Sequence, residues 1–150
     1  MTKSEEAIQY FRDGFNCAQS VLVPFRANFG MEENQCLKIA CAFGAGMGRQ
    51  QHTCGAVTGA IMVLGLQYGK GKRDDNTKKL DTYGKTVAFF EEFTRKHGSA
   101  TCLELLDGLR MSDPEDMKKI EELELHRKKC AQYVRDAVEI VGKMIQDANK

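Results

Sequence analysis

The sequence predicts an all-α protein, a single-domain bundle of about six or seven helices. Apolar residues recur at the i, i+3, i+4, i+7 spacing in most segments, whereas alternating runs of β-branched residues are scarce. The 150 residues include only two prolines, so few helices are interrupted. A chain of this length buries roughly two-thirds of its unfolded surface, and its core needs no disulfide or metal in order to form.

The first two helices are marked by the residues at their N-termini. Thr2 and Glu5 have the spacing of a capping box and predict a helix over residues 4–12. Asn16 and Gln19 repeat this N-cap and N3 spacing at the start of a second helix.

Proline and glycine shape the next segments. Pro24 is expected to kink or shorten the second helix, and a third helix is predicted at about residues 32–43. The glycine-rich run Gly44–Arg49 follows it. There the backbone is expected to adopt a conformation that a Cβ would obstruct, or to lie close to another segment.

The longest uncharged stretch, residues 50–69, is predicted to contain the central buried helix. Thr53 is the expected N-cap of this helix. Gly55 with Gly59, or Ala56 with Ala60, has the small-xxx-small spacing that lets a second helix approach closely. Polar residues leave its continuous apolar part too short to span a membrane.

A polar link, residues 69–76, precedes a long helix predicted over residues 77–97 that stops at Gly98. The apolar residues at helical spacing on this helix are Leu80, Tyr83, Val87 and Phe90, with Phe89 and Phe93 widening the face.

Three more helices are predicted after Gly98. A short one covers residues 102–107, after Thr101 as the N-cap and with Glu104 at the capping-box position. The Asp113-Pro114 pair opens another, and the last covers about residues 129–147.

The charges nearly cancel, with 22 Lys and Arg against 21 Asp and Glu, so no overall field attracts nucleic acid or anionic lipid. The first residues show no basic stretch followed by an apolar run, and we expect no secretory signal and a cytoplasmic location. A reducing compartment disfavours permanent disulfides. It favours catalytic, redox or metal-binding roles for the six cysteines.

Three cysteines follow directly after predicted N-cap residues, at Cys17, Cys54 and Cys102. The partial positive charge and free N–H groups of a helix N-terminus stabilise a thiolate, which is both the redox nucleophile and the metal ligand. Any one of these could instead be a small buried residue, but three at helix starts favour chemistry. We therefore predict that at least one of these thiols has a lowered pKa.

The other cysteines give weaker signals. Cys130 lies on the apolar side of the last helix and four residues after His126, so the two side chains share one helix face. Cys36 and Cys41 are five residues apart and lie on different faces, which favours core or incidental roles. No C-x-x-C pair occurs. Any shared site must therefore be assembled by the fold.

The run Cys54–Gly59 matches the pattern C-G-A-x-x-G. With Cys17 before it and Cys102 and Cys130 after it, the chain resembles the C_GCAxxG_C_C family, whose redox activity is itself inferred from its cysteines. The resemblance covers nearly the whole chain. It implies four functional thiols, at Cys17, Cys54, Cys102 and Cys130, and no known reaction.

Three functions remain open. In the first, the protein is a thiol–disulfide oxidoreductase in which Cys54 or Cys17 attacks and a second cysteine resolves the mixed disulfide, in company with a redox protein partner. In the second, the same four thiolates, Cys17, Cys54, Cys102 and Cys130, hold an iron–sulfur cluster or Zn²⁺. In the third, the thiols fill the core of an interaction protein. We also expect a homo-oligomer, to which the apolar helix faces could contribute.

Overall fold

The structure is a computed structural model that describes residues 1–148, and these contain helices and no strand. The α-helices are α1 (Lys3–Arg12), α2 (Cys17–Leu22), α3 (Glu33–Cys41), α4 (Gly44–Met47), α5 (Gly55–Tyr68), α6 (Asn76–His97), α7 (Cys102–Leu105), α8 (Pro114–Glu122) and α9 (Ala131–Ala148). A 3-10 segment, η1 (Val23–Phe29), follows α2, and a π-helical segment, η2 (His126–Cys130), precedes α9. Six of the described α-helices have nine residues or more, which confirms the predicted all-α class.

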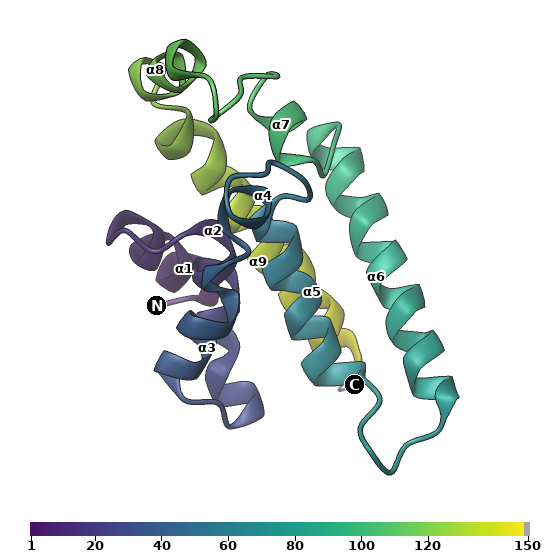
Figure 1. Ribbon diagram of the computed structural model, residues 1–150. Coiled ribbons are helices and arrows are strands. Elements are labelled where there is room, and N and C mark those ends of the chain that lie inside the picture. Colours follow the sequence, from purple (N-terminus) through teal and green to yellow (C-terminus); the bar gives the residue numbers. More distant parts are fainter. Residues whose placement is uncertain (149–150) are drawn as a thin grey trace.

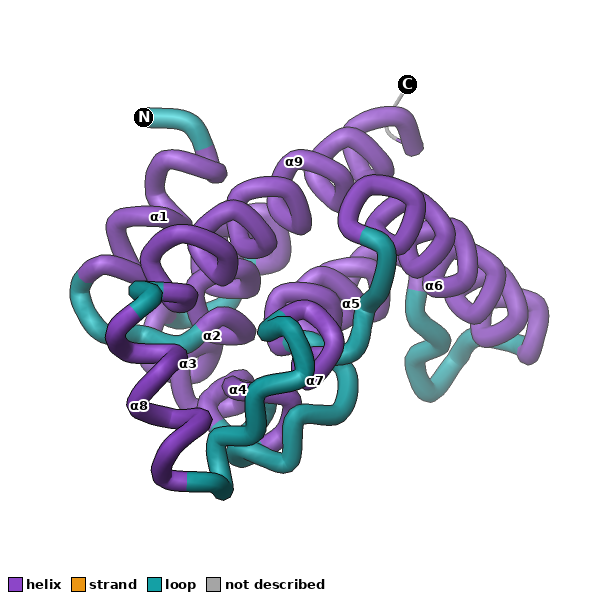
Figure 2. The backbone as a smooth tube through the Cα atoms, turned by 90° about the horizontal axis from the view of Figure 1, so that it is seen from above, coloured by secondary structure: helices purple, strands orange, loops and turns teal. Residues whose placement is uncertain are grey.

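Helix α5 is the centre of the bundle, as predicted. It packs against α2, α6 and α9, and Figures 1 and 2 show it between these helices. A Cβ on Gly59 would lie 2.8 Å from the backbone oxygen of Ala18 in α2, closer than real Cβ contacts. The absence of a side chain at Gly59 therefore lets α2 and α5 pack backbone to backbone.

The local start signals in the first helices are confirmed. The Thr2–Glu5 and Asn16–Gln19 capping boxes both form, each with its two reciprocal hydrogen bonds. Pro24 lies in the first turn of η1. The α-helix α2 therefore ends at Leu22, and the chain continues as a 3-10 helix, which agrees with the predicted shortening.

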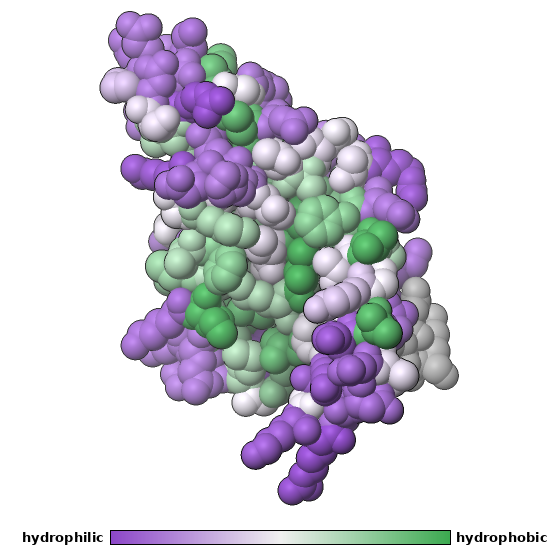
Figure 3. Space-filling model, turned by 45° about the vertical axis from the view of Figure 1, so that its right-hand side comes forward, coloured by the Kyte–Doolittle hydropathy of each residue, from purple (hydrophilic) through white to green (hydrophobic). Residues whose placement is uncertain are grey.

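The prediction for the apolar face of α6 is wrong in part. Phe89 and Phe93 are fully buried, whereas Leu80, Tyr83 and Val87 are 57–62% exposed. Helix α6 contacts the bundle through α5 and α9 along one side, so its second apolar stripe faces outward. Figure 3 shows hydrophobic surface between the more polar ends of the molecule.

Helices α7 and α8 form a small second core at one end of the bundle (Figure 1). The buried residues of this core are Cys102, Leu106, Ile120 and Leu125. Helix α8 begins as predicted, with Asp113 as N-cap and Pro114 in the first turn. None of the helices within residues 1–148 is both long and apolar enough to cross a bilayer.

Candidate functional site

Backbone pairing brings two of the cysteines together. An isolated antiparallel β-bridge joins the residues just before them. The N–H of Cys54 donates to the carbonyl of Ala100 at 2.8 Å, and the N–H of Cys102 donates to the carbonyl of His52 at 2.7 Å. This bridge fixes the starts of α5 and α7 side by side.

The same bridge corrects two predicted caps. Thr53 pairs with Thr101 in the bridge, so the N-cap of α5 is Cys54 itself and not Thr53. Thr101 does precede Cys102 as the N-cap of α7, but its side chain makes no capping bond, and the box predicted with Glu104 does not form. Tertiary pairing here replaces the local capping pattern.

Cys17 lies against the start of α5. It is the first residue of α2, as predicted, and a Cβ added to Gly55 would lie 2.3 Å from the Cys17 Sγ. The sulfur therefore occupies the space that any side chain at position 55 would need. This contact places Cys17 next to Cys54 and explains why glycine follows that cysteine in the motif.

The glycine-rich segment wraps around the start of α2. Ala45 and Gly46 adopt left-handed conformations, with φ of 55° and 65°, and the Ala45 N–H bonds to the Cys17 thiol. A Cβ on Gly44 would lie 2.3 Å from the side chain of Asn16. The predicted close approach is thus confirmed, and it supplies the Cys17 sulfur with a backbone donor.

The fourth cysteine arrives from the C-terminal side. Cys130 ends the π-helical segment η2, and its Sγ lies 3.7 Å from Nδ1 of His126. Burial lowers the pKa of His126, which favours the neutral imidazole. The prediction that these two side chains share one helix face is confirmed. The prediction that the last α-helix begins at about residue 129 is wrong by two residues, because residues 126–130 are π-helical and α9 begins at Ala131.

All four thiols line one pocket of about 810 Å³. Its walls come from α1, α2, the first turn of α5, α7, η2 and α9. Cys17 and Cys130 are partly exposed, while Cys54 and Cys102 are 6% and 8% exposed. Cys17 and Cys130 are therefore the two residues of the cluster that keep more contact with solvent.

Burial raises the pKa of every thiol in the cluster. Those of Cys102 and Cys130 rise to about 12, and the pKa of Cys54 rises well above its ordinary value. A negative charge on Cys17 further raises the pKa of each of the other three. Cys17 and Cys130 thus each interact electrostatically with the other three thiols.

The predicted lowering of a thiol pKa is therefore wrong for the reduced protein. Backbone N–H groups of Ala45, Ala18 and Gly55 do lower the pKa of Cys17, and those of Ala56 and Val57 lower that of Cys54. Loss of hydration in the pocket outweighs these donors at both cysteines.

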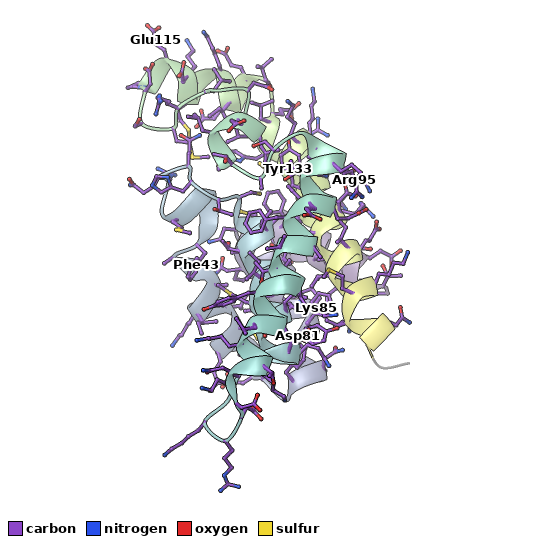
Figure 4. All side chains as sticks on the ribbon, turned by 90° about the vertical axis from the view of Figure 1, so that its right-hand side faces the viewer. Phe43, Asp81, Lys85, Arg95, Glu115 and Tyr133 are labelled. Carbon is purple, nitrogen blue, oxygen red and sulfur yellow. The ribbon has the colours of Figure 1, made fainter. Side chains whose placement is uncertain are left out.

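Tyr133 is a site residue that the sequence did not single out. Its hydroxyl donates to the carbonyl of Leu105 at 2.9 Å, and burial together with the nearby thiols raises its pKa to about 12. The ring packs edge-on against Phe93 and His97, near the C-terminal end of α6 (Figure 4). Tyr133 thus ties α7 to α9 beneath the thiols and remains protonated.

Gln51 was also missed. It is buried, adopts a left-handed conformation with φ of 57°, and donates to the carbonyl of Leu109 at 2.9 Å. Its Oε1 accepts from the N–H of Met111 at 2.7 Å. A glutamine in a polar run gives no sequence signal for these distant partners.

The remaining cysteines and histidines lie apart from the pocket. Cys36 is fully buried in α3 and Cys41 is exposed at its end, as their different faces predict. Nε2 of His97 lies 2.8 Å from a carboxylate oxygen of the buried Asp136, out of line for an N–H···O bond. His97 therefore lies against Asp136 of α9.

The sequence model of the family described as "Putative redox-active protein (C_GCAxxG_C_C)" matches residues 15–144. The chain belongs to this family. An uncharacterized protein of Archaeoglobus fulgidus is 27% identical over 158 aligned positions, which cover 98% of this chain and 98% of the relative. No solved structure matches the chain.

The structure explains the two glycines of the run Cys54–Gly59. Gly55 receives the sulfur of the first cysteine, Cys17, and Gly59 lets α2 pack against α5. All six cysteines are free thiols. Within residues 1–146, no group of three or more Cys, His, Asp or Glu side chains is placed so that it could hold a metal ion.

Proposed function

We propose that the protein is a dithiol reductant, in which Cys17 exchanges with disulfides and Cys54 resolves the mixed disulfide. The observation that supports this function is the convergence of four thiols on one pocket, with Cys17 in electrostatic contact with the other three. Four cysteines drawn from four separate helix ends are not an arrangement that core filling requires.

The accessibility of the thiols supports the order of the steps. Cys17 is partly exposed and has backbone N–H donors, so it is the thiol best placed to attack. Its thiolate attacks one sulfur of a disulfide, and the released half takes up the proton as a thiol. Cys54 then attacks the Cys17 sulfur, which releases the second half as a thiol and leaves a Cys17–Cys54 disulfide.

The direction of the pKa changes supports a reducing role. Strongly oxidising dithiol proteins owe their potential to a stabilised thiolate in the reduced form. Here burial acts against the thiolate at all four positions of the cluster. We place this activity in the cytoplasm, with a partner redox protein that returns two electrons to the Cys17–Cys54 disulfide.

Thiol titration and peptide mapping of protein purified without oxygen test this function. Addition of one equivalent of 2-hydroxyethyl disulfide should remove two thiols, and mass spectrometry should find a peptide joining Cys17 to Cys54. Cys17→Ser should lose this reaction, whereas Cys41→Ser, at an exposed cysteine outside the pocket, should retain it. A folded Cys17→Ser variant that still loses two thiols would refute the assignment.

The same preparation tests the second candidate function, four-thiolate binding of Zn²⁺ or an iron–sulfur cluster. The four thiols around one pocket are the donor set that either group uses. Stoichiometric zinc, or iron with visible absorbance, together with protection of four thiols, would replace the reductant proposal. Metal-free protein that undergoes the two-thiol reaction would support the reductant proposal.

A further inference from the structure

The charge around the thiol pocket differs from that of the chain as a whole. The chain has almost equal numbers of acidic and basic residues, but the described side chains that line the pocket include four Arg or Lys and no Asp or Glu. The basic residues are Arg12, Arg127, Lys128 and Arg135. The entrance is therefore a cationic patch on a nearly neutral protein.

Two of these cations, Arg12 and Arg135, are available to a ligand. The other two, Arg127 and Lys128, both pair with the carboxylate of Glu124, at 3.0 and 3.9 Å. No ion pair among the side chains of residues 1–146 includes Arg12 or Arg135, although Arg135 is near enough to Glu5 to lower its pKa. A rim with unpaired guanidinium groups favours carboxylate or phosphate groups, which Arg binds with two parallel hydrogen bonds.

The interior of the pocket suits the rest of such a ligand. A volume of about 810 Å³ lies in the range of small-molecule sites. Apolar side chains of α1 and of the residue that follows α7, among them Ile8, Phe11 and Leu106, line it beside the thiols. The site thus combines basic side chains, apolar walls and reactive sulfur.

From this arrangement we propose that the pocket binds small organic disulfides that carry carboxylate or phosphate groups and delivers their sulfur to Cys17. This inference rests on the proposed reductant function and adds its substrate class. The protein loses two hydrogens as the Cys17–Cys54 disulfide forms, and the ligand disulfide gains them as two anionic thiols. Arg12 and Arg135 are binding residues for the anionic ends and take no part in the exchange itself.

Three disulfides of similar size separate charge from chemistry. These are 3,3′-dithiodipropionate, which is dianionic, 2-hydroxyethyl disulfide, which is neutral, and cystamine, which is dicationic. Rates are divided by those for a free cysteine derivative, so that intrinsic reactivity cancels. We expect about a tenfold preference for the dianion over the neutral probe, a slower reaction with cystamine, and loss of the preference at high salt.

Substitutions then locate the preference. Arg12→Gln and Arg135→Gln should each reduce it about threefold or more, whereas Lys79→Gln, an equal change of charge on α6 outside the pocket, should not. Oxidised glutathione and coenzyme A disulfide extend the series to carboxylate and phosphate ligands. The faster of the two identifies which anion the rim prefers.

A binding measurement on the unaltered protein covers the case in which an Arg variant does not fold. Suberate has the length of dithiodipropionate without its sulfurs. It should slow the alkylation of Cys17 by the neutral reagent iodoacetamide, whereas 1,8-octanediol should not.

The outcomes distinguish this inference from the function on which it rests. If no disulfide of any charge oxidises the protein, the reductant function fails. If all three probes react at equal corrected rates, or if suberate gives no protection, the reductant function stands and the anionic pocket is refuted. A preference that survives both Arg substitutions also refutes it.

Discussion

Two glycines of helix α5 differ in their surroundings: Gly59 lies against the backbone of α2, and Gly65 does not. The Cβ of a Gly59→Ala variant would lie 2.8 Å from the carbonyl oxygen of Ala18 and 3.0 Å from the Cβ of Val21. Gly65 lies in the same helix with no atom within 4 Å of its Cβ position. Both substitutions gain up to about 1 kcal/mol of helix propensity, because alanine has less backbone freedom to lose than glycine.

The two variants should therefore separate in stability. Overpacking at Gly59 costs about 1–3 kcal/mol, since a backbone carbonyl cannot rotate away as a side chain does. Gly65→Ala should raise the free energy of unfolding by up to about 1 kcal/mol, and Gly59→Ala should fall about 1–3 kcal/mol below it. At about 2–4 °C per kcal/mol for a chain of this size, the melting temperatures should differ by several degrees.

Thermal and urea unfolding followed by circular dichroism measure this difference. The alkylation rate of Cys17 gives a second readout, because this residue begins α2 and moves if α2 is displaced. If Gly59→Ala is as stable as Gly65→Ala and Cys17 reacts at the wild-type rate, the backbone contact between α2 and α5 does not exist as described.

Three further tests address the thiols, the loop beside them and the core. The pKa of Cys102 is raised to about 12 in the folded protein. Above about pH 8.5 this thiol therefore ionises in the unfolded chain while it stays protonated in the folded one. The free energy of unfolding falls as pH rises, by up to about 1.4 kcal/mol per pH unit for this group. Urea titrations between pH 8 and 10.5 should show a shallower fall in Cys102→Ala, and parallel curves would contradict the burial of this thiol. Gln51→Ala removes the two hydrogen bonds that the Gln51 side chain makes with the backbone of Leu109 and Met111, and it should cost about 1–3 kcal/mol, with faster amide exchange in this loop. Unchanged exchange would show that the side chain does not hold the loop. Phe93→Ala should cost about 3–5 kcal/mol and Tyr83→Ala, on the exposed stripe of the same helix, less than about 0.5 kcal/mol, and similar losses from the two in urea unfolding would disprove the orientation of α6.

Local signals in the sequence predicted the helix starts well. The boxes that begin at Thr2 and Asn16 depend on residues three positions apart, and both form. The box expected at Thr101 has the same local spacing but fails, because its backbone pairs with Thr53. A pairing between residues 48 positions apart leaves no mark in either segment, so sequence spacing could not reveal it.

The site shows the same limit. The pattern of Cys17, Cys54, Cys102 and Cys130 identified thiols that line one pocket, yet the expected direction of their pKa was wrong. The helix N-terminus is a local property that can be read from the sequence, whereas loss of hydration depends on what packs around the sulfur. The choice between the two apolar stripes of α6 fails for the same reason, because both have helical spacing and packing alone decides which is buried.

The bridge between Thr53 and Thr101 joins the two ends of the α5–α6 hairpin. Helix α5 begins just after this bridge and α6 ends just before it, so their connection over residues 69–75 lies at the far end of the molecule (Figure 1). Changes in the length of that connection are absorbed far from the pocket. The connection is therefore the natural position for an inserted reporter domain, which would follow the protein in a cell while its thiols keep their positions.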